Sequence, residues 1–281
     1  MYKLVCIDMD GTLLNSKKKI SNANRVALKK AYDMGVHIVI TTGRIYINAA
    51  YYSNLVGVDS PVIAANGGII KEGDEFIYKR TMSREVNTKI LEICNKYKAN
   101  PRFHTSKDTY DGKSFFDYMN LIFLYEFVLK IKSKGYKVKL HHIKNAKQWV
   151  DVFKTEEKEI IKCDIIDSDI EKIKKIKEEL KKIEYIQVLG AGLHGVEVTH
   201  KSVSKGAAVK YLAQRYNIKK EEIITIGDNE NDIEMIEYGG LGVAMGNAIE
   251  KLKDSADYIA ATNDEDGVAK VINEFIVNRG K

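Results

Sequence analysis

Short apolar runs alternate with helical patterns at both ends of this 281-residue chain, and this alternation most constrains its fold. Continuous apolar runs are typical of buried strands in parallel sheets, and the amphipathic segments between them are typical of the connecting helices. The first and last 80 residues therefore predict parallel βα units. The expected strands span 3–9, 36–41, 62–65, 223–227 and 241–244.

Helices are expected between these strands. Ser21 is a good N-cap for a helix that ends at Gly35 and places Val26, Leu28 and Ala31 inward. Further helices are predicted at 45–56, 204–216 and 231–238, with another after Asp264, and a hairpin is predicted around Gly73-Asp74.

The middle of the chain has a different pattern. Residues 83 to about 190 mix helices with shorter strands, and one helix at 171–183 is apolar on one face and lysine-rich on the other. At about 150 residues per domain, the length predicts two domains. We therefore expect an α/β fold: a doubly wound, mainly parallel, Rossmann-like core from residues 1–82 and 188–281, with an inserted α+β domain at 83–187.

The charges are unevenly distributed. The chain has 45 basic and 39 acidic residues, a net charge of +6, and the segment 84–190 carries 23 basic and 17 acidic residues, which is the whole excess. Such a mild positive charge argues against a nucleic-acid partner. No apolar run approaches the about 18 residues of a membrane-spanning helix, so no membrane partner is expected either.

The three cysteines, Cys6, Cys94 and Cys163, are far apart and lie in apolar patterns without metal-ligand spacing. They are expected to be buried core residues in a reducing compartment. These observations predict a cytoplasmic protein that is a monomer or a weak homodimer.

Two carboxylates follow the first apolar run directly, in Asp8-Met9-Asp10-Gly11-Thr12. Residues two apart on a strand lie on the same side of the pleat, so Asp8 and Asp10 should be close, and Gly11 lets the chain turn sharply. Paired anions repel unless a cation lies between them, and Mg²⁺ is a hard cation that prefers oxygen ligands. The motif therefore favours a Mg²⁺ site over a surface turn.

Three further polar segments lie where a strand ends or a helix begins. Thr41-Thr42-Gly43-Arg44 suits a phosphate oxygen, although Arg44 could instead bond structural carboxylates. Lys205 stands at a helix start, where the dipole disfavours a cation unless carboxylates or phosphate lie nearby. The run 227–232, GDNEND, gathers several oxygen ligands. Ligands of doubly wound sheets bind at the carboxyl ends of strands, so these segments predict one common site.

The ordered set DMDGT, TTGR, SKG and GDNEND resembles the four motifs of the haloacid dehalogenase (HAD) superfamily. Asn66-Gly67-Gly68 and the large insertion between the second and third motifs resemble its Cof-type phosphatase subclass (IIB) with a C2-type cap. The chain departs from that pattern at Ile45 and His200, where proline is frequent. The resemblance implies a Mg²⁺-dependent phosphatase, a phosphoric monoester hydrolase. It would act on small phosphorylated metabolites, sugar phosphates or similar, through an aspartyl-phosphate, with the cap setting specificity.

The resemblance also implies a role for each matched residue. Asp8 would attack the phosphoryl group, and Asp10 would protonate the leaving alcohol and later deprotonate water. The implied catalytic set is Asp8, Asp10 and Lys205. The implied metal set is Asp8, Asp10 through its carbonyl, Asp228 and Asp232, the last of which would orient Lys205 or a metal-bound water. The residues expected to bind phosphate or substrate are Thr42, Gly43, Arg44, Asn66, Lys205 and Asn231, with Thr41 as the alternative to Thr42.

Other functions are compatible with the same residues. A phosphosugar mutase would return the phosphate from Asp8 to substrate rather than to water. A receiver-like phosphoacceptor signalling protein uses similar aspartates without turnover, but it is a compact single domain, shorter than this chain. A binding protein that has lost catalysis would not need the full catalytic set. The histidines share no metal-ligand spacing, and adjacent His141 and His142 should point in opposite directions on a strand.

Overall fold

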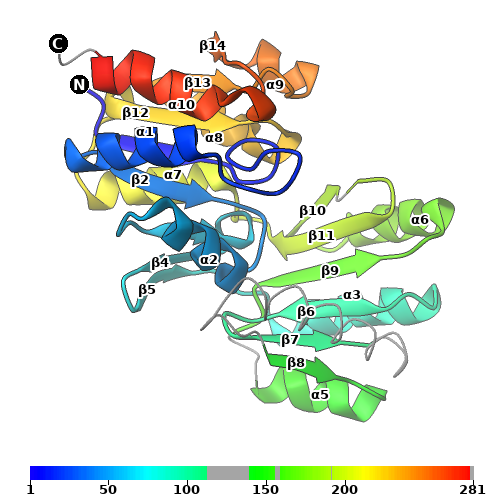
Figure 1. Cartoon of the computed structure of the whole chain (residues 1–281). Coiled ribbons are helices and arrows are strands. Elements are labelled where there is room, and N and C mark those ends of the chain that lie inside the picture. The colour runs from blue at the N-terminus through cyan, green and yellow to red at the C-terminus, as the bar shows by residue number, and fades with distance from the viewer. Residues whose placement is uncertain (113–138, 156–158, 191, 279–281) are drawn as a thin grey trace. The chain divides into compact units, whose positions relative to one another are not determined.

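The computed structural model describes residues 1–112, 139–155, 159–190 and 192–278 (Figure 1). The chain divides into two compact units, Met1–Tyr78 with Ser204–Lys281, and Lys79–Val203. The first unit thus combines both ends of the chain around an insertion. Residues 79–82 and 188–203 belong to the second unit, whereas the sequence analysis placed them in the first. The main reason is that a strand at Gly195–His200 pairs with strands of the insertion.

The first unit is built on an eight-stranded sheet in the order β14-β13-β12-β1-β2-β3-β4-β5. Its strands are β1 (Leu4–Ile7), β2 (His37–Thr41), β3 (Val62–Ala64), β4 (Ile69–Glu72), β5 (Glu75–Lys79), β12 (Ile223–Gly227), β13 (Leu241–Ala244) and β14 (Tyr258–Ile259). The pairings from β14 through to β3 are parallel, and β3 pairs with β4 antiparallel. The chain order reverses where β1 lies beside β12, and doubly wound sheets bind ligands at such a switch point.

Helices cover both faces of this sheet (Figure 1). They are α1 (Asn22–Asp33), α2 (Tyr46–Val56), α7 (Lys205–Arg215), α8 (Ile233–Tyr238), α9 (Glu250–Asp254) and α10 (Gly267–Ile272). Successive residues of β1 point to opposite faces: Val5 packs in one core cluster with Leu28 of α1, and Leu4 packs in another with Val209 of α7. Apolar burial on both faces confirms the doubly wound, mainly parallel sheet.

In helix α1 the predicted N-cap is confirmed, but Val26, which was predicted to face inward, is exposed. The Ser21 side chain accepts a hydrogen bond from the Asn24 N–H at 3.0 Å. Val26 is 43% exposed, whereas Leu28 is fully buried. Two residues along a helix are about 200° apart around its axis, so the two side chains cannot share one face.

The second unit has a six-stranded sheet in the order β10-β11-β9-β6-β7-β8, antiparallel except for the β7-β8 pair. Its strands are β6 (Pro101–His104), β7 (Asp108–Asp111), β8 (Lys139–His142), β9 (Lys162–Ile166), β10 (Ile186–Gly190) and β11 (Gly195–His200). The helices within its described residues are α3 (Arg84–Lys96), α5 (Ala146–Thr155) and α6 (Ile170–Leu180). A separate apolar core joins Phe103, Trp149 and Ile176, which confirms the α+β insertion.

All three cysteines are buried and free, as predicted. Among the helices of the described residues, none has both the length and the apolar character that crossing a bilayer requires.

Candidate active site

The polar residues singled out in the sequence lie at one edge of the first sheet. Asp8, Thr42 and Asp228 directly follow β1, β2 and β12, and Lys205 is the first residue of α7. The carboxyl ends of neighbouring parallel strands share an edge, so three short loops and one helix N-terminus bring these residues together.

Lys205 joins two of the carboxylates. Its Nζ lies 2.5 Å from Asp8 Oδ1 and 2.6 Å from Asp232 Oδ1, and its side chain is only 1% exposed. Burial alone would lower the pKa of Lys205, but the charges of Asp232 and Asp8 outweigh it and raise that pKa. The ammonium is therefore charged, and two ion pairs explain why a cation occupies the N-terminus of α7.

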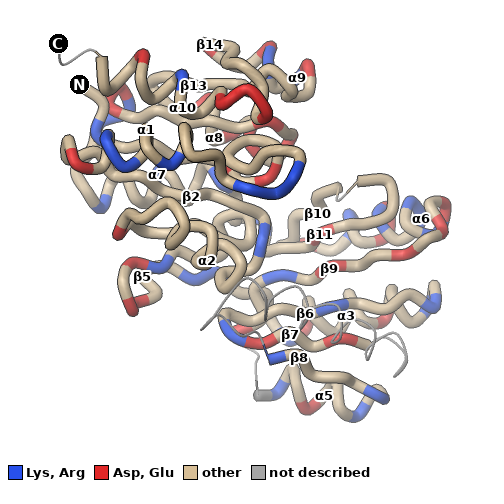
Figure 2. The backbone as a smooth tube through the Cα atoms, in the orientation of Figure 1, with Lys and Arg blue, Asp and Glu red and all other residues tan. Residues whose placement is uncertain are grey.

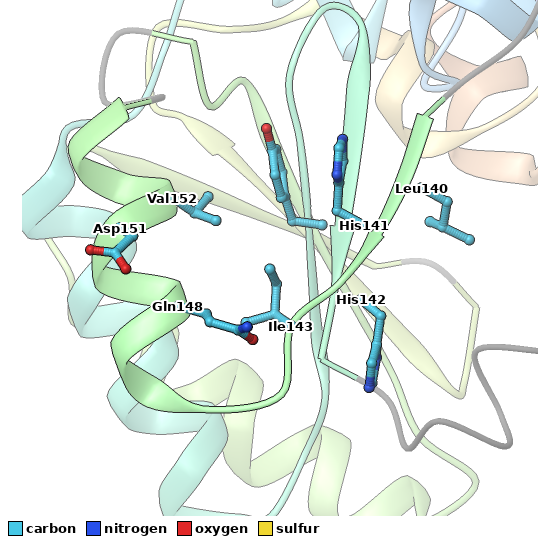
Figure 3. Close-up of a pocket in the computed structure, with 8 residues that line it drawn as sticks. Leu140, His141, His142, Ile143, Gln148, Asp151 and Val152 are labelled. Carbon is cyan, nitrogen blue, oxygen red and sulfur yellow. The ribbon is translucent and has the colours of Figure 1, made fainter.

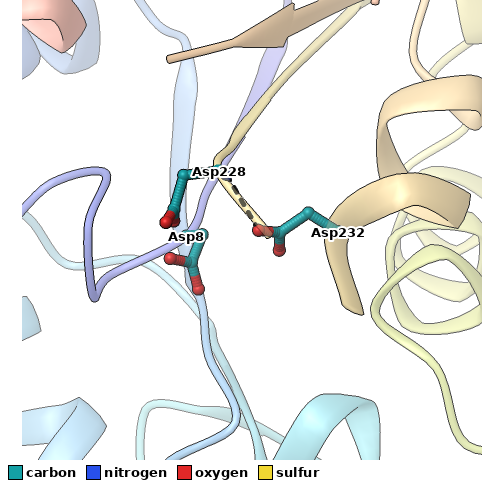
Figure 4. A group of neighbouring side chains, drawn as sticks. All are labelled: Asp8, Asp228 and Asp232. Carbon is teal, nitrogen blue, oxygen red and sulfur yellow. Dashed lines mark hydrogen bonds between the residues drawn. The ribbon is translucent and has the colours of Figure 1, made fainter. Parts of the chain in front are cut away.

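Asp8, Asp228 and Asp232 form an acidic cluster, with carboxylate oxygens within 4.8 Å of one another (Figure 4). Burial raises the pKa of Asp8; Lys205 opposes this shift, and Asp232 and Asp228 add to it. Burial and then the charge of Asp232 also raise the pKa of Asp228. Were all three carboxylates ionised, they and Lys205 would sum to −2, and one divalent cation would neutralise the group.

The donor set fits Mg²⁺, which takes hard carboxylate oxygens. Asp232 is engaged through both oxygens, because Oδ1 pairs with Lys205 and Oδ2 accepts the N–H groups of Asp228 and Asn229 at 3.0 Å each (Figure 4). Asp8 and Asp228 are therefore the better direct ligands, and Asp232 is placed to orient Lys205 and the loop that carries Asp228.

The turn after β1 is shaped to approach Asp228 closely. Gly11 has φ +84°, and a Cβ at this position would overlap the Asp228 carboxylate. The hydroxyl of the buried Thr12 donates to Asp228 Oδ1 at 2.9 Å. Thr12 lies in the first motif, but nothing in the sequence assigned it a role.

Asp10 lies apart from the acidic cluster and is held by two cations. Arg44 donates from Nε to Asp10 Oδ2 and from Nη2 to Asp10 Oδ1, both at 2.6 Å, and Lys18 Nζ lies 3.0 Å from Asp10 Oδ1. Burial alone would raise the pKa of Asp10, but Arg44 and then Lys18 outweigh it and lower that pKa. Arg44 thus bonds a carboxylate, the alternative noted for it above, and nothing in the sequence distinguished Lys18 within its run of lysines.

The second motif lies against Asn66. The Asn66 N–H donates to the Thr42 carbonyl at 3.0 Å, and Asn231 Nδ2 donates to Asn66 Oδ1 at 3.0 Å. A Cβ at Gly43 would lie 2.8 Å from Asn66 Oδ1, so glycine permits this approach. Thr42 follows β2 directly and its Oγ1 accepts the Arg44 N–H at 3.1 Å, whereas Thr41 is the last residue of the strand itself. Thr42 is therefore the better placed of the two threonines.

The second unit contains a pocket of its own. It is lined by Tyr110, Leu140, His141, His142, Ile143, Gln148, Asp151 and Val152 (Figure 3). The His141 ring stacks on Tyr110 at 4.8 Å between centroids, and the His142 side chain points the other way, as predicted for neighbours on a strand (Figure 3). None of the predicted site residues lines this pocket.

Comparison with known proteins agrees with this geometry. The chain matches the model of the haloacid dehalogenase-like hydrolases over residues 5–272. The protein belongs to this family. Among HAD relatives, the 5-amino-6-(5-phospho-D-ribitylamino)uracil phosphatase YcsE of Bacillus subtilis (strain 168) is 32% identical over 276 residues, which cover 98% of this chain and 96% of YcsE.

Solved HAD structures have the same fold. A haloacid dehalogenase-like hydrolase from Bacteroides thetaiotaomicron has a TM-score of 0.83 at 28% identity, covering 98% of this chain and 100% of its own. The subclass IIB sugar phosphatase BT4131 has a TM-score of 0.77 at 26% identity, covering 97% of this chain and 98% of its own. The protein is accordingly a Cof-type, subclass IIB HAD phosphatase: a phosphoric monoester hydrolase for small phosphorylated metabolites.

Proposed function

We propose that this phosphatase hydrolyses phosphate monoesters of small sugar-like alcohols, with Mg²⁺, through an aspartyl-phosphate on Asp8. The observation that carries the proposal is the buried cluster in which Lys205 joins Asp8 and Asp232 beside Asp228. The substrate class is supported by the relatives, since YcsE is named for a phosphorylated ribityl compound and BT4131 for sugar phosphates.

The reaction has two displacements at phosphorus. In the first, a carboxylate oxygen of Asp8 bonds to phosphorus, the bond to the alcohol oxygen breaks, and Asp10 gives that oxygen a proton. In the second, water attacks the same phosphorus and gives a proton to Asp10, and the bond to Asp8 breaks to release inorganic phosphate. The lowered pKa of Asp10 suits its role as the base of the second step, and the proton that it gains there supplies the first step of the next turnover.

The remaining residues orient the reacting groups and neutralise their negative charge. Lys205 holds one Asp8 oxygen and offsets negative charge on the transferring group, while Asp232 keeps Lys205 in place. Asp8, Asp228 and the Asp10 carbonyl would hold Mg²⁺, which supplies positive charge next to the phosphoryl oxygens. Those oxygens would be bound by Thr42, Gly43, Asn66 and Asn231. Accelerations of phosphate monoester hydrolysis reach ~10²¹, which requires such groups to act together.

A panel of phosphorylated metabolites, assayed with and without Mg²⁺, tests the proposal. We expect turnover of phosphorylated sugars and polyols that chelation abolishes and Mg²⁺ restores, and a loss of about 10⁴-fold or more in kcat for Asp8→Asn. Full activity after exhaustive chelation would contradict the role of Mg²⁺. A stable phosphoprotein without phosphate release would indicate a receiver, and phosphate transfer to a second substrate hydroxyl would indicate a mutase.

A further inference from the structure

The loop between β1 and α1 carries three consecutive lysines, which form a basic stretch in the first unit (Figure 2). Lys18, the middle one, places its Nζ 3.0 Å from Asp10 Oδ1, the oxygen that Arg44 Nη2 also contacts. Of Asp10, Lys18 and Arg44, the reaction proposed above requires only Asp10. The loop therefore brings a second cation to the carboxylate that serves the leaving alcohol.

The loop is built to hold Lys18 there. Lys18 has φ +53°, a left-handed conformation that costs a non-glycine residue about 1 kcal/mol. Hydrogen bonds offset this cost: the Asn15 carbonyl accepts the Lys18 N–H at 2.8 Å, and Asn15 Oδ1 accepts the N–H groups of Lys17 and Lys19 at 3.1 and 3.0 Å. The Ser16 N–H donates to Asp264 Oδ1 at 2.9 Å, so the loop is also tied to a distant part of the chain.

The charges around Asp10 are not balanced. Arg44 and Lys18 carry two positive charges against one carboxylate, whereas the acidic cluster with Lys205 reaches zero when one divalent cation binds. The Lys18 side chain is 57% exposed and that of Arg44 is 28% exposed, so a ligand has access to both. An ammonium has three donor hydrogens and a guanidinium has five. Asp10 takes one from Lys18 and two from Arg44, whose guanidinium also lies over the Tyr52 ring at 5.2 Å.

We propose that Lys18 and Arg44 form an anion subsite beside Asp10, selecting monoesters whose alcohol portion carries a second negatively charged group. This inference rests on the proposed function, because Asp10 marks the leaving-group oxygen only if it protonates that oxygen. The subsite belongs to the first unit alone and depends on charge rather than on the shape of the alcohol.

Three esters of equal chain length test the subsite: propyl phosphate, 3-phosphonooxypropanoate and 3-aminopropyl phosphate. The variant is Lys18→Gln, and the matched control is Lys17→Gln, which removes the same charge from the neighbouring position. We expect the wild type to favour the carboxylate ester by kcat/KM, and Lys18→Gln to reduce that preference about 5-fold, as for a partly exposed ion pair. The aminopropyl ester should become a better substrate of Lys18→Gln, and Lys17→Gln should leave the ranking unchanged.

The possible results distinguish a failure of the proposed subsite from a failure of the proposed function. An equal loss on all three esters would overturn the subsite, because Lys18 would then serve the phosphoryl group or the loop. Equal changes in both variants would overturn it too, since general surface charge would suffice. If the wild type hydrolyses none of the esters with Mg²⁺ but hydrolyses phosphorylated sugars, the subsite alone fails. If it hydrolyses no monoester at all, the proposed function fails as well.

Discussion

The charged groups of the reaction centre, three aspartates and one lysine, lie within a few ångströms of one another. Lys205 is almost fully buried, and burying an ion pair costs free energy unless its geometry is good. Both carboxylate contacts of Lys205 are short, and Asp232 is further fixed by two backbone N–H groups. The cluster is thus arranged before substrate arrives, which electrostatic stabilisation of a transferring phosphoryl group requires.

Replacing Asp10 by asparagine should separate the two displacements. Asp10→Asn keeps the Asp8 nucleophile and the acidic cluster but removes the base for water. With an ester whose leaving group needs no proton, such as 4-nitrophenyl phosphate, we expect a burst of one nitrophenol per protein followed by slow release of phosphate. Intact mass spectrometry should detect the phosphorylated protein. Steady turnover at the wild-type rate would show that another group activates the water.

Gly11 should be required for metal binding and not only for the turn. Gly11→Ala places a Cβ against the Asp228 carboxylate, so we expect a higher Mg²⁺ concentration for half-maximal activity. The matched control is Gly35→Ala, which has φ +87° and nothing within 4 Å of its Cβ. Both variants should lose about 1 kcal/mol in the free energy of unfolding by urea, because both strain a left-handed residue. An unchanged Mg²⁺ requirement in Gly11→Ala would contradict the role of Asp228 as a ligand.

Within the second sheet, three neighbouring strands share a buried charge network. His104 Nε2 of β6 lies 3.0 Å from Asp164 Oδ2 of β9, and Lys162 Nζ of β9 lies 3.1 Å from Asp164 Oδ1 and 2.6 Å from Glu197 Oε1 of β11. Burial alone would raise the pKa of Asp164, but Lys162 and His104 outweigh it and lower that pKa. The network therefore links β6, β9 and β11 by side-chain contacts as well as by backbone pairing.

This network predicts how the second unit responds to acid. The folded-state pKa of Asp164 lies below its unfolded value of about 3.9, so its contribution to stability is full above that value and falls as the pH drops toward the folded pKa. Asp164→Asn should be less stable at pH 7 and should lose less further stability between pH 5 and pH 3. Urea unfolding followed by Trp149 fluorescence measures both. Asp167→Asn removes a carboxylate whose partner, Lys172, is 25% exposed against 4% for Lys162, and should change the slope less.

For the whole molecule, the two units differ in charge. Residues 79–203 hold 26 basic and 18 acidic side chains, and the remaining residues hold 19 and 21, so the net charges are +8 and −2. Lys174 of α6 pairs with Glu171, and Lys181, directly after the helix, pairs with Glu178 on the exposed surface. The excess that remains is available to attract anionic metabolites, within a screening length of about 8 Å at physiological salt.

Deleting residues 79–203 and joining Tyr78 to Ser204 with a flexible linker should leave a folded first unit, because its apolar clusters do not depend on the insertion. We expect it to hydrolyse a small generic ester with Mg²⁺ and to keep the preference for anionic alcohols that Lys18 and Arg44 give, but to lose the rest of the ranking among natural metabolites. The salt dependence of kcat/KM should weaken, since the positive unit is gone. If the deletion variant kept the full-length ranking, specificity would reside in the first unit, around Asn66 and Arg44.

The sequence by itself determined the layers of this protein and the strand ends that carry its polar residues. The alternating apolar runs predict buried parallel strands. Neighbouring parallel strands end at a common edge of the sheet, which places Asp8, Thr42 and Asp228 close together. The tertiary structure alone decided which groups touch: Thr12 on Asp228, Arg44 and Lys18 on Asp10, and the strand at Gly195–His200 joining the second sheet. These contacts depend on loop conformation and side-chain reach between residues far apart in the chain, which hydrophobic periodicity does not encode.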